Sequence, residues 1–231
     1  MIEKGICKLA CVPIRKDAGS IYEMVSQLLY GETYTIIEKQ NGWLKIECDY
    51  DNYIGWISAN QHSANDIGLS YNGICKNLIE QIHINNSIIN ITAGASVEGS
   101  IYELNWENIY TQSSLYINAP YLWGGRSPFG IDCSGFTQVI YKSIGIKLLR
   151  DAEQQAAEGE TIDFASTAKP GDLAFFDNTE NKIIHVGMIW TDGQIIHAHG
   201  KVRIDKFDQE GIYNIDTHSY SHKLRIIKRF L

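Results

Sequence analysis

The sequence predicts an α+β fold in which a small all-β barrel precedes a mixed domain of helices and strands. Three observations support this prediction. Short segments rich in β-branched and aromatic residues fill residues 1–60, apolar residues recur at helical spacing from about residue 105, and strand patterns then continue to the C-terminus. We therefore expect a barrel over 1–60, a connecting segment over 61–104 and a second domain over 105–231.

In the first part, three segments read as strands at close spacing: residues 33–39, 42–48 and 53–58. Asparagine, glycine and aspartate separate them, which is typical of tight turns. In the connecting segment, KNLIEQI at 76–82 indicates a helix and SIINITA at 87–93 indicates a strand.

The second part begins with two helical patterns. One places Trp106, Ile109, Tyr110 and Ile117 on a common face, and the other starts directly after Cys133. Four strand patterns follow, namely KPGDLAFFD (169–177), KIIHVGMIW (182–190), GQIIHAHG (193–200) and LRIIKRFL (224–231). Helices followed by a run of strands favour an α+β domain.

Composition narrows the class of protein. The 231 residues carry a formal net charge of −7 and contain no basic run, which argues against a nucleic-acid partner. No segment approaches the ~18 uninterrupted apolar residues of a membrane span. The five cysteines, an odd number without an export signal, favour reduced thiols in the cytoplasm, provided that no signal peptide has been removed. Cys7 and Cys11 have no second pair to complete a zinc site, so we expect neither metal nor cofactor.

The segment FGIDCSGFTQVIYK raises the question of whether Cys133 is a nucleophile or a packed core residue. Asp132 is suited to cap a helix, and the apolar pattern begins at Phe136. Cys133 is then expected at a helix N-terminus, where unpaired amides stabilise a thiolate and a developing oxyanion. A nucleophile of this kind also needs a base.

Two strand patterns each carry a histidine, and the loop between them decides whether the rings meet. A two-residue loop at 192–193 pairs Thr191 with Gln194. It leaves His197 opposite Met188, on the face away from the first histidine.

A three-residue loop over 191–193 instead places His197 opposite Gly187, on the same face as His185. Its final glycine fits a common hairpin type, so we favour it. His185 then accepts the thiol proton and His197 orients its ring. His199, which would lie directly opposite His185, is a rival for the orienting position.

Residues 110–231 resemble the NlpC-type cell-wall cysteine peptidases. The resemblance lies in five motifs that follow one another in the order PYLWGGRSPFGIDCSGF, RDAEQQ, KPGDLAFF, HVGMIW and IIHAHG. The resemblance implies a papain-like fold with Cys133 as nucleophile, His185 as base and His197, rather than His199, as third member. It also implies that the hydroxyl of Tyr121 contributes to the oxyanion site.

Residues 5–60 resemble a bacterial Src-homology-3-like domain. Together the two parts are similar to γ-D-glutamyl-L-diamino acid endopeptidases that recycle murein peptides with a free N-terminal L-alanine. This resemblance implies substrate contacts at Glu32 and Tyr53 of the barrel and at Asp151, because an ammonium group needs a carboxylate or an aromatic face. Asp132 and Ser134 flank the nucleophile and are also candidate substrate contacts, although capping alone explains Asp132.

Two other functions compete with this interpretation. The chain is alternatively a peptidoglycan-binding module beside an inactive catalytic fold, or an amidase or acyltransferase on a related fold. The presence of Cys133, His185 and His197 together favours the peptidase over the binding module, and DCSG with RDAEQQ favours it over the acyltransferase. Ala152 departs from the serine or threonine that is frequent at this position of the family, which puts one substrate contact in doubt.

Overall fold

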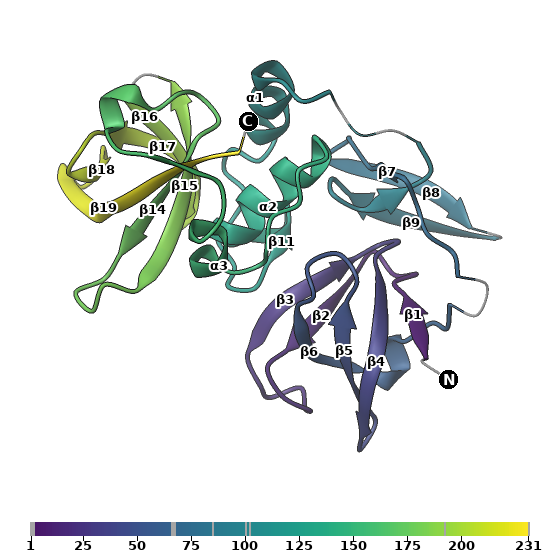
Figure 1. Ribbon diagram of the computed structural model, residues 1–231. Coiled ribbons are helices and arrows are strands. Elements are labelled where there is room, and N and C mark those ends of the chain that lie inside the picture. The colour runs from purple at the N-terminus through teal and green to yellow at the C-terminus, as the bar shows by residue number, and fades with distance from the viewer. Residues whose placement is uncertain are drawn as a thin grey trace.

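A computed structural model describes residues 3–65, 68–84, 86–99, 101, 103–191 and 193–230. Asp192 of the hairpin loop therefore lies outside the described residues. Three groups of elements follow one another along the chain: an N-terminal barrel, a small connecting region, and a helical layer that packs on a C-terminal sheet. In Figure 1 helix α2 lies between the barrel and the C-terminal sheet.

The barrel is a six-stranded antiparallel sheet with the order β1-β4-β5-β6-β2-β3. Its strands are β1 (Lys4–Ile6), β2 (Cys11–Arg15), β3 (Met24–Leu29), β4 (Thr33–Gln40), β5 (Trp43–Cys48) and β6 (Ile54–Ser58). The three strands expected from the sequence correspond to β4, β5 and β6. Along β5 the buried residues alternate with half-buried ones, because one face of the strand packs on the core of the barrel.

The connecting region contains a short 3-10 helix, η1 (Ala59–Gln61), followed by four short strands: β7 (Gly73–Ile74), β8 (Ile79–Ile84), β9 (Ser87–Thr92) and β10 (Ser96–Val97). The expected strand at 87–93 is confirmed, whereas the helix at 76–82 is wrong. Residues of β8 pair with β9 in an antiparallel hairpin that the Ile84–Ser87 pair closes. Ile82 and Ile84 alternate with polar residues, and this period of two overrides the helical propensity of the segment.

Three helices separate the barrel from the C-terminal sheet: α1 (Trp106–Ser114), α2 (Cys133–Ser143) and α3 (Ala152–Ala156). A two-stranded turn of β11 (Arg126–Ser127) and β12 (Gly130–Ile131) leads into α2. All eleven residues of α2 are buried. Helix α1 ends at Ser114, so Ile117 of the expected helical face lies beyond it.

The C-terminal sheet has the order β13-β19-β14-β15-β16-β17-β18, and pairing of β18 with β19 closes its larger part into a barrel. Its strands are β13 (Glu160–Ile162), β14 (Leu173–Asp177), β15 (Ile183–Thr191), β16 (Gln194–His199), β17 (Lys201–Phe207), β18 (Gly211–Asn214) and β19 (Ser219–Arg229). A second 3-10 helix, η2 (Ala165–Thr167), joins β13 to β14. Helix α2 packs on β15 and β16.

The β15–β16 hairpin combines features of both loop lengths considered above. Thr191 pairs with Gln194, as a two-residue loop requires, yet His197 pairs with Gly187, as the three-residue loop requires. A bulge between Ile189 and Thr191 reconciles the two pairings, because it adds one residue to β15. The favoured loop length was therefore wrong, but the expected position of His197 opposite Gly187 is confirmed.

Among the described residues, no helix is long and apolar enough to cross a lipid bilayer.

Candidate active site

Cys133 is the first residue of α2, and Asp132 caps that helix. The Oδ1 atom of Asp132 accepts a hydrogen bond from the backbone N–H of Gly135 at 2.7 Å. Backbone hydrogen bonds from Val186 and Ser134 reach the Cys133 thiol, which is buried. Because Val186 follows His185 on β15, the sulfur lies beside the strand that carries the expected base.

Cys133 and His185, the predicted nucleophile and base, both lie where burial favours the neutral form. Burial, and then the charge of Asp132, raises the pKa of the Cys133 thiol to about 12. Burial and the neighbouring histidines lower the pKa of His185 well below its usual value. Desolvation of the sulfur thus opposes the thiolate that the helix N-terminus favours, and the resting thiolate stays a prediction.

His185 begins a chain of hydrogen bonds that runs into the interior of the C-terminal sheet. Its Nε2 atom lies 2.9 Å from Nδ1 of His197, and Nε2 of His197 lies 3.0 Å from Oδ2 of Asp205. All three side chains are at most 5% exposed. The chain leaves Nδ1 as the one ring nitrogen of His185 that does not take part in it.

Two further histidines surround this chain. His199 is exposed, and its ring centroid lies 6.3 Å from that of His185. The hydrogen bond of His185 is made with His197 rather than with His199. The ring of His222, on β19, stacks on His185 at 4.2 Å between centroids. Burial and the neighbouring histidines lower the pKa of His222 to about 4, so this ring is neutral at physiological pH.

Because the pKa of His185 lies below its usual 6.5, its base function should survive mild acid. We expect kcat/KM to stay level as the pH falls to about 6.5 and to decline only at lower pH, where His185 takes up a proton. Hydrolysis rates at subsaturating substrate between about pH 5 and pH 8 measure this limb. A decline centred at or above pH 7 would contradict the neutral, buried state of His185.

Tyr121 lies near the nucleophile. It is half-buried, and its backbone N–H donates to the carbonyl of Gly200 at 3.0 Å. Burial, followed by the proximity of Cys133, raises the pKa of its phenol, which therefore stays protonated. A protonated hydroxyl beside the sulfur is the donor that an oxyanion requires, and this role of Tyr121 stays a prediction.

A cavity of about 530 Å³ opens at the sulfur and lies between the two domains. The barrel contributes Lys16, Glu23 and Tyr53 to its walls, and the second domain contributes Trp123, Cys133, Ser134 and Asp151. Burial, and then the charge of Asp151, raises the pKa of Tyr53 to about 12, so the two predicted substrate contacts lie near each other. Trp123, which is 56% exposed, was not expected from the sequence.

Asp132 and Ser134 line the same cavity, but the polar atoms of their side chains are hydrogen-bonded to Arg150. The guanidinium of Arg150 donates to both carboxylate oxygens of Asp132, at 2.6 and 3.1 Å, and to the hydroxyl of Ser134 at 2.9 Å. Gly124 donates a backbone N–H to Asp132 as well. These contacts assign both side chains to the support of the nucleophile, which leaves their backbone groups for a substrate.

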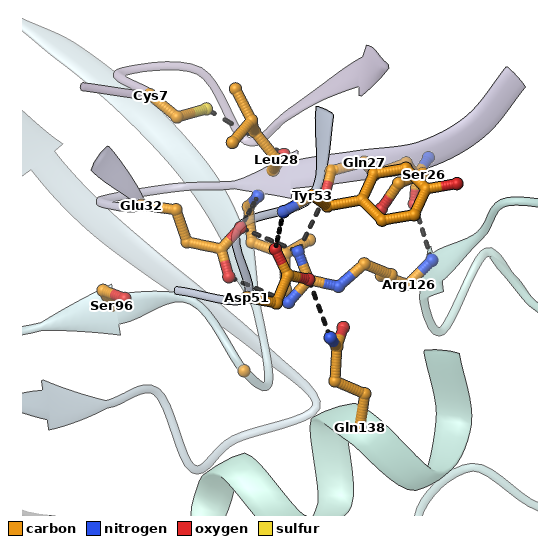
Figure 2. A network of polar contacts seen from close by, with 12 residues as sticks. Cys7, Ser26, Gln27, Leu28, Glu32, Asp51, Tyr53, Ser96, Arg126 and Gln138 are labelled. Atoms are coloured by element: carbon orange, nitrogen blue, oxygen red, sulfur yellow. Dashed lines mark hydrogen bonds and ion pairs between the residues drawn. The ribbon is translucent and has the colours of Figure 1, made fainter. Parts of the chain in front are cut away.

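The structure does not bring Glu32 to this cavity. Its carboxylate is 4% exposed and accepts two hydrogen bonds from Arg126, at 2.8 and 2.9 Å, and one from Lys142 at 2.6 Å. The backbone N–H of Leu29 donates to it at 2.9 Å. Figure 2 shows Glu32, Asp51 and Arg126 in one network at the junction of barrel and helices. The expected substrate contact at Glu32 is therefore corrected to an ion pair between domains.

The four histidines do not form a metal site. Within the described ranges, no three histidine, cysteine, aspartate or glutamate side chains are arranged to hold a metal ion. All five cysteines are free thiols.

Sequence reasoning missed Asp205, Arg126 and Arg150 as parts of the site or its support. A signal existed for Asp205, since a turn at Gly200 between two strand patterns places it opposite Ile195, two residues before His197. No local signal marks Arg126, because its partner Glu32 lies 94 positions away.

Comparison with known proteins assigns both parts of the chain. Residues 118–221 match the NlpC/P60 family, and residues 14–61 match the bacterial dipeptidyl-peptidase Sh3 domain. A stretch of 94 residues, 40% of this chain, is 40% identical to the γ-D-glutamyl-L-lysine dipeptidyl-peptidase of Bacillus cereus and covers 28% of it. The same share of the chain is 42% identical to the enzyme of that name from Bacillus subtilis and covers 31% of it. The matches thus span less than a third of these relatives.

Solved structures extend the likeness to the whole chain. The crystal structure of an NlpC/P60 family protein from Bacillus cereus superposes with a TM-score of 0.81 at 19% identity, covering 99% of both chains. An NlpC/P60 endopeptidase from Photobacterium damselae gives 0.71 at 14% identity, covering 96% of this chain and 70% of the other. At such identities the likeness shows the fold alone. The sequence matches and the fold agree that this chain carries an NlpC/P60 domain behind a bacterial Sh3 domain.

Proposed function

We propose that this chain is a cysteine endopeptidase that cuts murein peptides between γ-D-glutamate and the following L-diamino acid, when the peptide begins with a free L-alanine. The observation that carries the proposal is the position of Cys133, at the N-terminus of α2, at one cavity wall with the His185–His197–Asp205 chain behind it. The similarity to the γ-D-glutamyl-L-lysine dipeptidyl-peptidases of two Bacillus species supports the γ-D-glutamyl bond as the one that is cut.

The proposed reaction begins from the neutral pair that burial favours. The Cys133 sulfur attacks the scissile carbonyl carbon while its proton passes to Nδ1 of His185. The resulting oxyanion accepts a hydrogen bond from the protonated Tyr121 hydroxyl. His185 then returns the proton to the leaving amine, the C–N bond breaks, and a thioester remains. Water, deprotonated by the same nitrogen, hydrolyses the thioester and frees the thiol.

The charges around the cavity support the recognition of a free amine. Asp132 and Arg150 neutralise each other, which leaves the carboxylates of Glu23, Asp151 and Glu153 against the single ammonium of Lys16. Desolvation raises the pKa of Asp151, so this carboxylate gains from a cationic partner. Tyr53 adds an aromatic wall beside it.

Comparison of L-Ala-γ-D-Glu-L-Lys with its N-acetylated form tests the proposal. We expect cleavage of the free peptide and a kcat/KM at least about 10²-fold lower for the acetylated one, because acetylation removes the charge and leaves the carboxylates unpaired. The N-methyl-L-alanine form is the control for size, since it adds bulk but keeps the charge.

Equal rates for the free and acetylated peptides would contradict the recognition of a free amine. If neither peptide is cut and the protein binds intact sacculi, the binding-module alternative holds instead. The five free thiols fit a reducing compartment, and we propose a cytoplasmic role in the turnover of released murein peptides.

A further inference from the structure

The hydrogen-bond chain behind the nucleophile does not end at the second histidine. Nε2 of His197 meets Oδ2 of Asp205 at 3.0 Å, and neither side chain is exposed to solvent. We propose that Asp205 is a positioning residue that fixes where the protons sit on His197 and His185, and thereby keeps Nδ1 of His185 free to act as the base.

Asp205 is held as an ionised, purely accepting group. The backbone N–H of Ile215 donates to its Oδ1 at 3.1 Å, and Nη2 of Arg203 donates to the same atom at 2.9 Å. Although burial opposes ionisation, hydrogen bonds from His197 and Arg203 lower the pKa of Asp205 far below its usual range. Arg203 is in turn fixed by Asp216 at 2.8 Å. The carboxylate thus offers only lone pairs, from a rigid position.

The proton positions follow from this single fixed acceptor. Nε2 of His197 must carry a hydrogen to reach the Asp205 carboxylate, so Nδ1 of a neutral His197 is an acceptor. The atom opposite that acceptor, Nε2 of His185, must then carry a hydrogen as well. A neutral His185 protonated at Nε2 has its lone pair at Nδ1, which is the atom left to take the proton from Cys133.

An amide in place of the Asp205 carboxylate should exchange donor and acceptor in each hydrogen bond of the chain. In Asp205→Asn the amide oxygen is expected at the Oδ1 position, where it faces two groups that can only donate, the N–H of Ile215 and Nη2 of Arg203. The Oδ2 position faces one such group, Nε of Arg203 at 2.8 Å, beside Nε2 of His197, which can change from donor to acceptor. The amide NH₂ then faces Nε2 of His197 and turns that nitrogen into an acceptor. The protons shift to Nδ1 of both rings, and the nitrogen needed for base catalysis is blocked. Asp205→Ala imposes no tautomer, so a share of the molecules keeps the productive one.

This reasoning predicts an unusual order of effects. We expect kcat to fall by about 10³-fold in Asp205→Asn and by about 10-fold in Asp205→Ala, with KM little changed in either. Thermal stability should follow the opposite order, since alanine leaves a cavity and uncompensated donors whereas asparagine keeps the shape. A merely structural role would rank activity and stability alike. Asp208→Asn, the same change at an exposed carboxylate directly after β17 that accepts a hydrogen bond from the Tyr220 hydroxyl, is the control and should keep most activity.

The kinetic arm rests on the proposed function, and a second readout does not need a substrate. Nitrogen-15 NMR of the histidine rings in the unaltered protein should show hydrogen on Nε2 of both His185 and His197, and its transfer to Nδ1 in Asp205→Asn. Hydrogen on Nδ1 of His197 in the unaltered protein, or an Asp205→Asn variant with higher kcat than Asp205→Ala, would overturn the inference even if the peptide specificity is confirmed. Correct tautomers without cleavage of the murein peptides would count against the proposed function only.

Discussion

Cys133→Ala is expected to lower kcat/KM for the free murein tripeptide by at least about 10⁴-fold, the scale on which triad nucleophiles act. Alanine keeps the small apolar volume at the first position of α2 and removes only the sulfur that forms the acyl-enzyme. The cavity and its remaining hydrogen-bond donors can then still bind the peptide and polarise the scissile carbonyl, but no acyl-enzyme can form. Steady-state cleavage of L-Ala-γ-D-Glu-L-Lys, followed by chromatographic separation of lysine, measures the loss.

The same change elsewhere separates chemistry from folding. Cys11→Ala removes a half-buried thiol from the barrel and should leave activity near that of the unaltered protein. Cys133→Ala should also unfold at a similar temperature, because its side chain is replaced by one of comparable hydrophobic character. The double variant Cys133→Ala/His185→Ala should have little less activity than Cys133→Ala alone, because the thiol and the imidazole act as a unit. Retention of a tenth or more of the activity by Cys133→Ala would remove Cys133 from the role of nucleophile.

Much of the fold could be predicted from local patterns in the sequence. The strands β4, β5 and β6 and the start of a helix at Cys133 follow from side-chain periodicity and turn residues. The position of His197 opposite Gly187 was predicted from the wrong loop length, and a bulge in β15 produces the same pairing. Periodicity failed in β8, where Ile79 and Ile82 fit a helical period but Ile82 and Ile84 fit a period of two. It also failed for the loop length at 191–193, because a bulge changes the count of residues without changing the pattern of apolar side chains.

The residues of the candidate site could be predicted where their positions depend on nearby secondary structure. Cys133 sits at a capped helix start, and His185 and His197 sit on adjacent strands, so short-range rules brought them together. Glu32 shows the limit of such rules, since its role depends on Arg126 and Lys142, which lie 94 and 110 positions away. A carboxylate in a turn motif looks the same in the sequence whether it meets a substrate or a buried guanidinium.

The second large effect concerns stability at that ion pair. Glu32→Gln is expected to lower the free energy of unfolding by about 3–5 kcal/mol, because it leaves Arg126 and Lys142 buried without their shared counter-charge. Glutamine keeps the shape of the side chain, so packing is not the cause. Urea unfolding at neutral pH measures the change. Glu38→Gln, which breaks an ion pair between half-exposed side chains of the same barrel, is the control and should change little.

The contribution of Glu32 should also depend on pH with a definite sign. Burial alone would raise its pKa, but Arg126 and Lys142 outweigh burial and lower the pKa to about 2. A carboxyl group whose pKa is depressed by folding stabilises the folded state above its unfolded pKa of 4.5 and loses that effect as the pH falls toward 2. The stability difference between the unaltered protein and Glu32→Gln should therefore shrink from about pH 4.5 downward. A difference independent of pH would mean that the carboxylate charge is not what holds the domains.

Lys142 provides the complementary arm of this experiment. Burial lowers the pKa of Lys142 despite the attraction of Glu32, so its charged form is only partly compensated. Lys142→Met keeps an unbranched side chain in the same space and leaves the two hydrogen bonds between Glu32 and Arg126 intact. It should therefore destabilise the protein clearly less than Glu32→Gln. Equal losses for the two variants would show that Arg126 alone does not satisfy Glu32, and that the junction of the domains depends on both cations.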